Sequence, residues 1–352
     1  MDLEKLIAQA QESTLFTAPI LGPHLRKFLK EKGDMLKYLA KQALNEGVEH
    51  IYWVGAGNSR VNLLSGKELM DRFTNIPSDC YFSYEFIWRN PKRLKKKSWV
   101  FLASFSGATE DTVMALRHAN KIGAKTIVLV NKADSLMGKE ANEVIAYNSK
   151  GLYIMPLAAA FIFALELARL EGNRDVEVIL EDLYQIPTLL SRQYIDEKPK
   201  AMKLAEKFLN QNIIYTLGSG PCYGLAYKFG LTVFMENMRV NGCFMDATEF
   251  RHGPAEMFDR NKPAFVILMG TDESREMTAR VVKLVQMQNV PLIVYDMADY
   301  PDVHPLLAPF ALMIPLQWFA VYSCLMRGIT DLDERVLMGH GLMSKGDGIT
   351  WP

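Results

Sequence analysis

IYWVGAGNS (51–59) and IIYTLGSGP (213–221) repeat one pattern, an apolar run that ends in a glycine-containing turn and leads into a helical stretch. The first glycines of the two turns, Gly55 and Gly218, lie 163 positions apart. Further stretches repeat at nearly the same offset: WVFLASFSGATED (99–111) with AFVILMGTDESRE (264–276), and KTIVLV (125–130) with PLIVYD (291–296). Because several elements share one offset, the chain is predicted to contain the same domain twice.

The apolar runs of both copies predict parallel sheets. IVLV, VFLAS and FVILM show no alternation of apolar and polar residues, which is typical of strands covered on both faces. Helical stretches, 108–122 in the first copy and 274–288 in the second, separate these runs. The predicted fold class is therefore α/β, with two tandem doubly wound parallel-sheet domains of the flavodoxin-like type in a three-layer αβα arrangement. Such sheets bind ligands at the carboxyl ends of their strands.

The repeat divides the chain into five predicted segments. These are an N-terminal helical segment (1–45), a first domain (46–175), a helical linker (176–210), a second domain (211–330) and a C-terminal tail (331–352). The linker is expected to break at Pro187 and Pro199, because proline removes a helical hydrogen bond.

Residues 306–326 form an apolar stretch that is long enough to cross a bilayer. Pro309 and Pro315 interrupt it. The prolines favour a buried strand at 310–314 followed by a buried helix at 316–326 over a membrane span.

Composition excludes several classes of protein. The chain has 352 residues, of which 49% are hydrophobic and 23% charged, so it is expected to fold rather than to be disordered. Forty basic residues balance forty acidic ones, whereas nucleic-acid-binding proteins usually carry a basic excess. The cysteines and histidines form no zinc-binding spacing, and the N-terminus lacks the order of a signal peptide. We therefore expect a cytoplasmic protein that has no zinc site and binds neither nucleic acid nor membrane.

The third strand of the first copy ends in SFSGAT (104–109), a loop rich in hydroxyl groups. Ser104, Ser106 and Thr109 can donate hydrogen bonds to an anion. Gly107 allows close approach to the backbone, and a helix begins directly after the loop. The corresponding loop of the second copy, GTDES (270–274), carries two carboxylates that would repel a phosphate. This contrast favours a phosphate site in the first copy over an ordinary helix cap.

The turn after the first strand, GAGNSR (55–60), carries part of the glycine pattern of dinucleotide-binding loops. Arg60 stands where the third glycine of that pattern would be, so the turn does not predict nucleotide binding. Ser59 instead offers a hydroxyl at the same edge of the predicted sheet as the SFSGAT loop. We expect Ser59 to assist in binding the same anion.

The second copy carries two candidate acid–base residues. His252 precedes Gly-Pro and therefore lies on a turn, and its equivalent in the first copy is Trp88. Glu236, on a helix predicted over 223–238, has apolar neighbours in the sequence and corresponds to Arg72. A carboxylate in apolar surroundings has a raised pKa and can act as a general base. The alternative interpretations are a surface histidine and an exposed helix glutamate.

Four short motifs in the second half of the chain are distinctive: TEFRHGP (248–254), GTDESR (270–275), HPLLAPF (304–310) and DLDERV (331–336). Together with the SxSGxT loop, and with a glutamate sixteen residues before the HGP histidine, they resemble the SIS (sugar isomerase) family from about residue 45 onward. Within that family the chain is most similar to deglycases of 6-phosphorylated sugar–amino acid conjugates, of the fructoselysine 6-phosphate or glucoselysine 6-phosphate type.

The resemblance implies a reaction and a site. The hydroxyl loop and Ser59 would bind the sugar 6-phosphate, and the family's catalytic glutamate and histidine correspond to Glu236 and His252. The implied reaction is hydrolysis of the conjugate to hexose 6-phosphate and a free amino acid, by acid–base enolisation and imine hydrolysis without a cofactor. Related enzymes are homodimers with shared active sites, so His252 would act in its own or in the partner subunit.

The C-terminal tail departs from the glucosamine 6-phosphate synthases of the same family. Those enzymes carry a lysine four residues after an arginine, whereas Arg335 is followed there by Gly339, and the nearest candidates are His340 and Lys345. Two other functions stay open: a sugar-phosphate aldose–ketose isomerase, and a sugar-phosphate-binding regulator that is not an enzyme. The conjugated amine, and the choice between a 1-amino-ketose and a 2-amino-aldose linkage, are also open.

Overall fold

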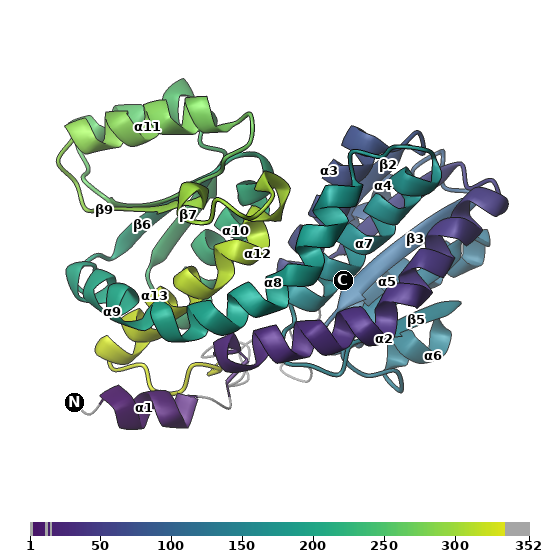
Figure 1. The fold of residues 1–352 in the computed structure, drawn as a ribbon, viewed down its shortest axis with the longest axis horizontal. Coiled ribbons are helices and arrows are strands. Elements are labelled where there is room, and N and C mark those ends of the chain that lie inside the picture. The colour runs from purple at the N-terminus through teal and green to yellow at the C-terminus, as the bar shows by residue number, and fades with distance from the viewer. Residues whose placement is uncertain (1–2, 11–12, 15, 335–352) are drawn as a thin grey trace. The chain divides into compact units, whose positions relative to one another are not determined.

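The computed structural model of the protein describes residues 3–10, 13–14 and 16–334 (Figure 1). The chain forms two compact units. One unit is Ile20–Leu189, and the other combines Met1–Pro19 with Leu190–Pro352. Each unit is built around one parallel sheet.

The boundaries between the units fall within two long helices. The helices of this part of the chain are α2 (Ala18–Asn45), α8 (Glu177–Asp196) and α9 (Lys198–Lys207). The predicted break at Pro187 is wrong, because α8 continues through this residue. A proline inside a helix removes one hydrogen bond, but buried side chains on both sides of it, such as Leu183 and Leu190, hold the helix together. Pro199 lies in the first turn of α9, where proline leaves no additional hydrogen bond unmade.

The first sheet belongs to the Ile20–Leu189 unit. Its strands are β1 (His50–Gly55), β2 (Ser78–Phe82), β3 (Ser98–Ser104), β4 (Lys125–Val130) and β5 (Glu143–Ala146). They lie in the order β2-β1-β3-β4-β5, and each neighbouring pair is parallel. This order confirms the predicted doubly wound sheet and places its switch point between β1 and β3.

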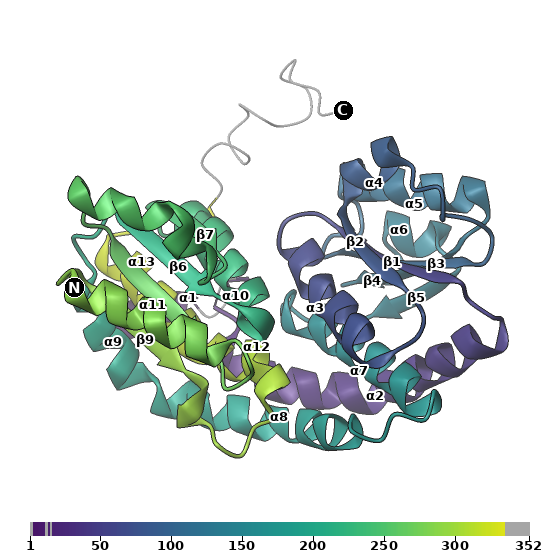
Figure 2. The same ribbon diagram turned by 90° about the horizontal axis from the view of Figure 1, so that it is seen from above.

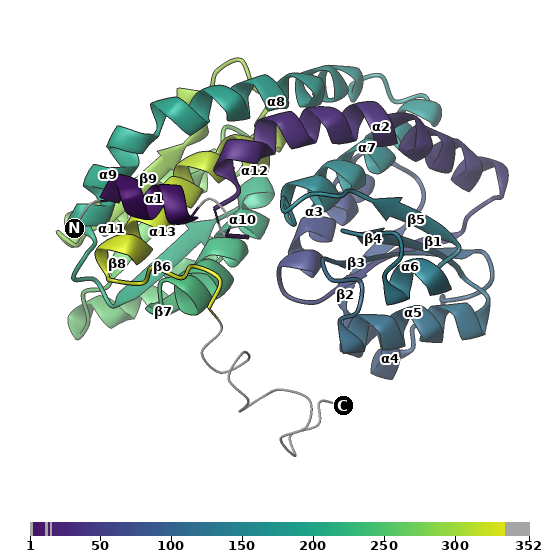
Figure 3. The ribbon, with the colours of Figure 1, turned by 90° about the horizontal axis from the view of Figure 1, so that it is seen from below.

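Helices cover both faces of the first sheet, as Figures 2 and 3 show. They are α3 (Asn58–Phe73) and α7 (Ile154–Leu170) on one face, and α4 (Ser83–Arg89), α5 (Glu110–Ile122) and α6 (Leu136–Glu140) on the other. Successive strand residues belong to different cores. Tyr52 packs with Phe86 of α4, whereas Trp53 contacts Phe163 of α7. The unbroken apolar runs of the sequence follow from this burial on both faces.

The second sheet repeats the order of the first. Within the described residues its strands are β6 (Ile213–Gly218), β7 (Asn241–Met245), β8 (Ala264–Met269) and β9 (Leu292–Asp296). They lie in the order β7-β6-β8-β9, again with parallel neighbours. Helix α11 (Arg275–Met287) buries Val281 and Val285 in the core of this sheet. The tandem α/β prediction is therefore confirmed.

The predicted strand at 310–314 is wrong. The segment forms two helices, α12 (Ala308–Ala311) and α13 (Met313–Met326). Pro309 and Pro315 lie in the first turns of these helices, where their missing N–H groups would have no helical acceptor. Among the described residues, Pro305–Met326 is long and apolar enough to cross a membrane, but its apolar window is entirely buried in the protein.

The helix predicted over 223–238 changes its winding. It begins as α10 (Tyr223–Tyr227) and continues as a π-helix, η2 (Lys228–Asn237), in which Gly230 approaches β7 closely. A Cβ atom on Gly230 would lie 2.7 Å from the Cys243 carbonyl oxygen, so a glycine is required at this contact. The remaining helices are α1 (Leu3–Ala10), η1 (Gly220–Cys222), α10 (Tyr223–Tyr227), η2 (Lys228–Asn237), η3 (Glu249–His252), η4 (Pro254–Asp259), η5 (Met297–Asp299) and η6 (Pro305–Leu307).

Trp53→Ala tests how much the packing between the first sheet and α3 stabilises the protein. The Trp53 ring is fully buried, stacks on Phe101 with 4.7 Å between ring centroids, and would lie 2.9 Å from a Cβ atom on Gly66. Its removal should lower the free energy of unfolding by about 3–5 kcal/mol, measured by urea denaturation. Trp88→Ala, at a 62% exposed position on α4, is the control and should change this free energy by less than about 0.5 kcal/mol. Equal effects of the two substitutions would contradict the conclusion that the packing of Trp53 stabilises the protein.

Candidate active site

The hydroxyl loop that follows β3 is organised around Ser104. The Ser104 hydroxyl lies 2.7 Å from the Thr109 hydroxyl and 3.5 Å from the Ser106 hydroxyl, and it accepts a hydrogen bond from the Gly107 N–H at 3.1 Å. The Ser106 oxygen accepts a further bond from the Ala108 N–H at 3.2 Å. Ser104 is buried, whereas Ser106 and Thr109 are exposed. The loop therefore exposes the outer two hydroxyls and holds them through the inner one.

Gly107 is the residue that permits this loop conformation. Its φ is +62°, in the left-handed region that favours glycine. A Cβ atom at this position would lie 2.2 Å from the Ser135 hydroxyl oxygen. The Gly107 carbonyl also accepts a hydrogen bond of 2.9 Å from the Met137 N–H of α6. The loop is thus fixed against its neighbouring helix on one side and open on the other.

Ser59 lies at the same edge of the sheet as the hydroxyl loop. It is half-buried in the first turn of α3, directly after the turn that ends β1. In the register of the sheet, Gly55 pairs with Ala103, so the ends of β1 and β3 are adjacent. This is the point where the strand order changes direction, the usual ligand position of doubly wound sheets.

The corresponding crevice of the second sheet contains a carboxylate of the protein itself. Asp272 accepts hydrogen bonds from the Ser274 N–H at 3.2 Å and from the Ser274 hydroxyl at 3.1 Å. Its oxygens would lie 2.6 Å from a Cβ atom on Gly220 and 2.1 Å from one on Gly270. The Asp272 carboxylate therefore occupies the space between the turns after β6 and β8. The expected contrast between the two copies is present in the structure.

Glu236 is exposed on η2. The prediction that it lies in apolar surroundings is wrong within the described chain. Its neighbours Phe234 and Met238 are buried, but Met235 is 44% exposed. Residues adjacent in a helical sequence point in different directions, so apolar neighbours in sequence do not create apolar surroundings in space.

His252 ends the short 3₁₀-helix η3, as its Gly-Pro neighbours predict. The adjacent Gly253 has a φ of +137°, which ends the helix. Phe250 anchors this segment in the core of the second sheet, and the His252 side chain is exposed. An exposed imidazole on an anchored turn is available to a ligand or to another chain.

The hydroxyl loop and the Glu236–His252 pair belong to different compact units. Ser59, Ser104, Ser106, Gly107 and Thr109 lie in the first sheet's unit, and the structure brings them to one edge of that sheet. Glu236 and His252 lie on separate elements of the other unit.

Lys228 is a candidate functional residue that the sequence analysis missed. It lies at the start of the π-helix that carries Glu236, and its side chain is buried. Burial lowers the pKa of Lys228 from its ordinary value of 10.5 to about 8, and the negative charge of Glu236 acts in the opposite direction. In the sequence, Lys228 is a lysine in an apolar predicted helix, eight residues before the candidate base Glu236. This pattern does not distinguish a buried lysine from an exposed one.

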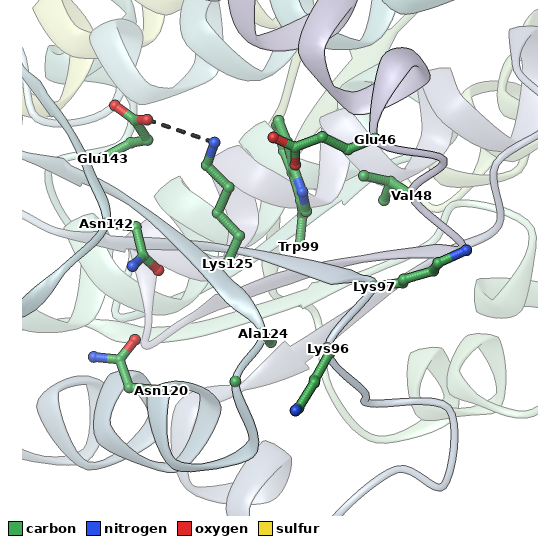
Figure 4. Close-up of a pocket in the computed structure, with 11 residues that line it drawn as sticks. Glu46, Val48, Lys96, Lys97, Trp99, Asn120, Ala124, Lys125, Asn142 and Glu143 are labelled. Carbon is green, nitrogen blue, oxygen red and sulfur yellow. Dashed lines mark ion pairs between the residues drawn. The ribbon is translucent and has the colours of Figure 1, made fainter.

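A cavity of about 500 Å³ in the first sheet's unit is shown in Figure 4. Lys125 forms an ion pair with Glu143 at 3.5 Å there, and its ammonium lies 4.6 Å from the centre of the Trp99 ring. These residues stand at the beginnings of strands β3, β4 and β5. The cavity is therefore at the amino edge of the sheet, opposite to the edge that carries Ser104.

Part of the predicted C-terminal string is anchored to the N-terminal segment. The Asp333 carboxylate accepts hydrogen bonds from the Ser13 hydroxyl at 2.9 Å and from the Thr14 N–H at 2.8 Å. The tail candidates Arg335, His340 and Lys345 lie outside the described residues.

The chain resembles known enzymes of sugar-phosphate metabolism. The SIS domain family matches residues 46–167. The fructoselysine 6-phosphate deglycase of Escherichia coli (strain K12) is 30% identical over 317 residues, which cover 90% of this chain and 93% of that protein. Fructosamine deglycase FrlB of Bacillus subtilis (strain 168) is 33% identical over 285 residues, covering 78% of this chain and 86% of that protein.

A crystal structure of a similar protein supports the relationship to this family. It is that of a Bacillus subtilis protein provisionally assigned as a phosphosugar isomerase, which matches with a TM-score of 0.72 and 31% identity over 80% of this chain and 89% of that one. The protein therefore belongs to the SIS domain family.

Lys228→Met should change how stability depends on pH. Because the folded-state pKa of about 8 lies below the unfolded value of 10.5, the unfolded protein binds more protons between these values. The wild-type free energy of unfolding should therefore rise with pH over this interval, by at most about 3 kcal/mol from this group. The methionine variant should lack this rise. Lys262→Met, at an exposed position, is the control and should retain it, as measured by urea denaturation at several pH values.

Proposed function

We propose that the protein is a deglycase that hydrolyses a 6-phosphorylated sugar–amino acid conjugate to hexose 6-phosphate and a free amino acid. The observation that carries this proposal is the hydroxyl loop at the switch point of the first sheet, in a chain 30% identical to a fructoselysine 6-phosphate deglycase over 317 residues. The loop has the chemistry of a phosphate site, and the identity extends over 90% of the chain.

The reaction reverses an Amadori rearrangement. A conjugate with the 1-amino-ketose linkage has a ketone at C2 and the amine on C1. A base removes a proton from C1 to give an enaminol, and protonation at C2 converts the enaminol into a C1 imine. Water then adds to the imine carbon, the carbinolamine expels the amine, and the aldehyde of the hexose 6-phosphate forms. Each step moves a proton, so two acid–base groups are sufficient.

Glu236 and His252 are assigned to these proton transfers. Glu236 would move the proton between C1 and C2, and His252 would open the sugar ring and protonate the oxygen or the leaving nitrogen. Both side chains are exposed, so both are accessible to a substrate. We further propose a homodimer in the cytoplasm, in which His252 acts in its own or in the partner subunit.

The phosphate anchor would supply orientation. The exposed Ser106 and Thr109 hydroxyls would hold the 6-phosphate, with Ser59 beside them. Binding energy from a group remote from the reacting carbon can then lower the barrier at C1.

An aldose–ketose isomerase is the second candidate, because the Bacillus subtilis structure with 31% identity is assigned to the phosphosugar isomerases. Both reactions begin with proton removal by a glutamate. Release of a free amine together with hexose 6-phosphate distinguishes the deglycase from the isomerase.

Glu236→Gln should abolish turnover of a phosphorylated conjugate, by at least about a hundredfold, because the amide cannot accept the C1 proton. Binding of hexose 6-phosphate, measured by calorimetry, should persist. Glu206→Gln, which changes an exposed glutamate of α9, is the matched control and should leave turnover unchanged. Full activity of Glu236→Gln would remove this residue from the mechanism.

Ser106→Ala should raise KM for the conjugate by about ten- to a hundredfold, because a hydrogen bond to a charged phosphate is lost. Inhibition by inorganic phosphate should weaken by a similar factor. Ser274→Ala, in the corresponding loop of the second sheet, should leave both constants unchanged. If inorganic phosphate inhibits the Ser106 variant as strongly as the wild type, the loop is not the anchor.

A further inference from the structure

Arg60 has a positioned side chain beside the hydroxyl loop. It follows Ser59 in the first turn of α3, and its guanidinium carbon lies 4.3 Å from the centre of the Phe82 ring. Phe82 ends β2 and is 41% exposed. A guanidinium over an aromatic face is held by cation–π attraction, which leaves its edge free to donate hydrogen bonds.

The side-chain donors of Arg60 have no hydrogen-bond partner among those found within the described part of the chain. Its Nε atom is buried and has no hydrogen-bond partner there, and none of the ion pairs of the described residues involves Arg60. The two carboxylates closest in sequence to Phe82 have other partners: Asp79 lies 2.9 Å from the His50 Nε2 atom, and Glu85 is paired with Arg89 at 3.0 Å. Because the Nε atom is enclosed by the protein, the donors of Arg60 that a ligand would contact are its two terminal NH2 groups.

The strand register places Phe82, on which Arg60 stacks, two strands away from the hydroxyl loop. Gly55 of β1 pairs with Phe82 of β2 on one side and with Ala103 of β3 on the other. Neighbouring strands are about 4.8 Å apart, so the Phe82 backbone lies about 10 Å from the end of β3. Phe82, on which the Arg60 guanidinium stacks, and the hydroxyl loop therefore lie on either side of the end of β1.

We propose that Arg60, stacked on Phe82, binds the α-carboxylate of the amino acid part of the substrate. This inference rests on the proposed deglycase function and narrows its substrate class. A planar guanidinium matches a carboxylate with two parallel hydrogen bonds. In a conjugate linked through the α-amino group, ten covalent bonds separate phosphorus from the carboxylate carbon, a span of roughly 12 Å when extended.

The spacing favours α-linked conjugates over ε-linked lysine conjugates. In the ε-linked case several more bonds separate the carboxylate from the phosphate, so the conjugate must fold back and lose more conformational freedom to bring its carboxylate to Arg60. The expected substrates are thus sugar 6-phosphates joined to the α-amino group of an amino acid.

The test compares two substrates in wild type and in Arg60→Met. One is the 6-phosphate of fructose linked to the α-amino group of alanine, and the other is the same sugar phosphate linked to ethylamine, which lacks the carboxylate. Wild type should favour the alanine conjugate by at least tenfold in kcat/KM. Arg60→Met should lose this preference through KM and retain its kcat/KM for the ethylamine conjugate. Phe82→Leu should weaken the preference by a smaller factor, because it removes only the platform.

Three outcomes would overturn the proposal: an unchanged preference in Arg60→Met, an equal loss for both substrates with weaker inhibition by inorganic phosphate, or a wild-type preference for the ε-linked lysine conjugate. The second outcome would assign Arg60 to the phosphate. Dissociation constants of the same compounds are also measured by calorimetry for wild type and for Arg60→Met, each with and without Glu236→Gln. The dissociation constants test the Arg60 proposal even if the protein turns over no conjugate. The turnover assay tests the deglycase proposal separately.

Discussion

The parallel register of β2, β1 and β3 is the constraint on which the proposed binding edge of the first sheet depends. Pairing of Gly55 with both Phe82 and Ala103 brings three strand ends into one row. Backbone hydrogen bonds of the sheet therefore fix the relative positions of these strand ends. The turn with Ser59, the hydroxyl loop and the Phe82 ring are attached to them. A shift of one residue in this register would move each group to the other face of the sheet.

The same scaffold is used differently in its second copy. Asp272 fills the crevice after β8 with a negative charge that the protein supplies, whereas the first copy leaves Ser106 and Thr109 exposed. An internal carboxylate satisfies the same local donors that an external anion would satisfy, so the second copy has no need of a phosphate there. The second copy instead carries the exposed Glu236 and His252. In the proposed function, the first copy anchors the phosphate and the second copy supplies the acid–base groups.

The π-helix shows how close backbone packing can create functional surroundings. Gly230 lets η2 approach β7, and the wider winding of a π-helix is often found at functional sites. The same helix buries Lys228 and exposes Glu236, so a desolvated ammonium and an accessible carboxylate interact along one element. The buried charge is unfavourable for folding, and such groups cluster at functional sites.

The sequence alone determined the duplication, the α/β class and the hydroxyl loop, because apolar periodicity, glycine spacing and capping residues act over short distances. Tertiary structure decided the helical form of 308–326, the burial of Lys228 and the exposure of Glu236. It also decided the contact between Arg60 and Phe82, which the sequence separates by more than twenty positions. These properties depend on which distant segments cover a side chain and how closely the backbones approach, and a linear pattern does not contain that information.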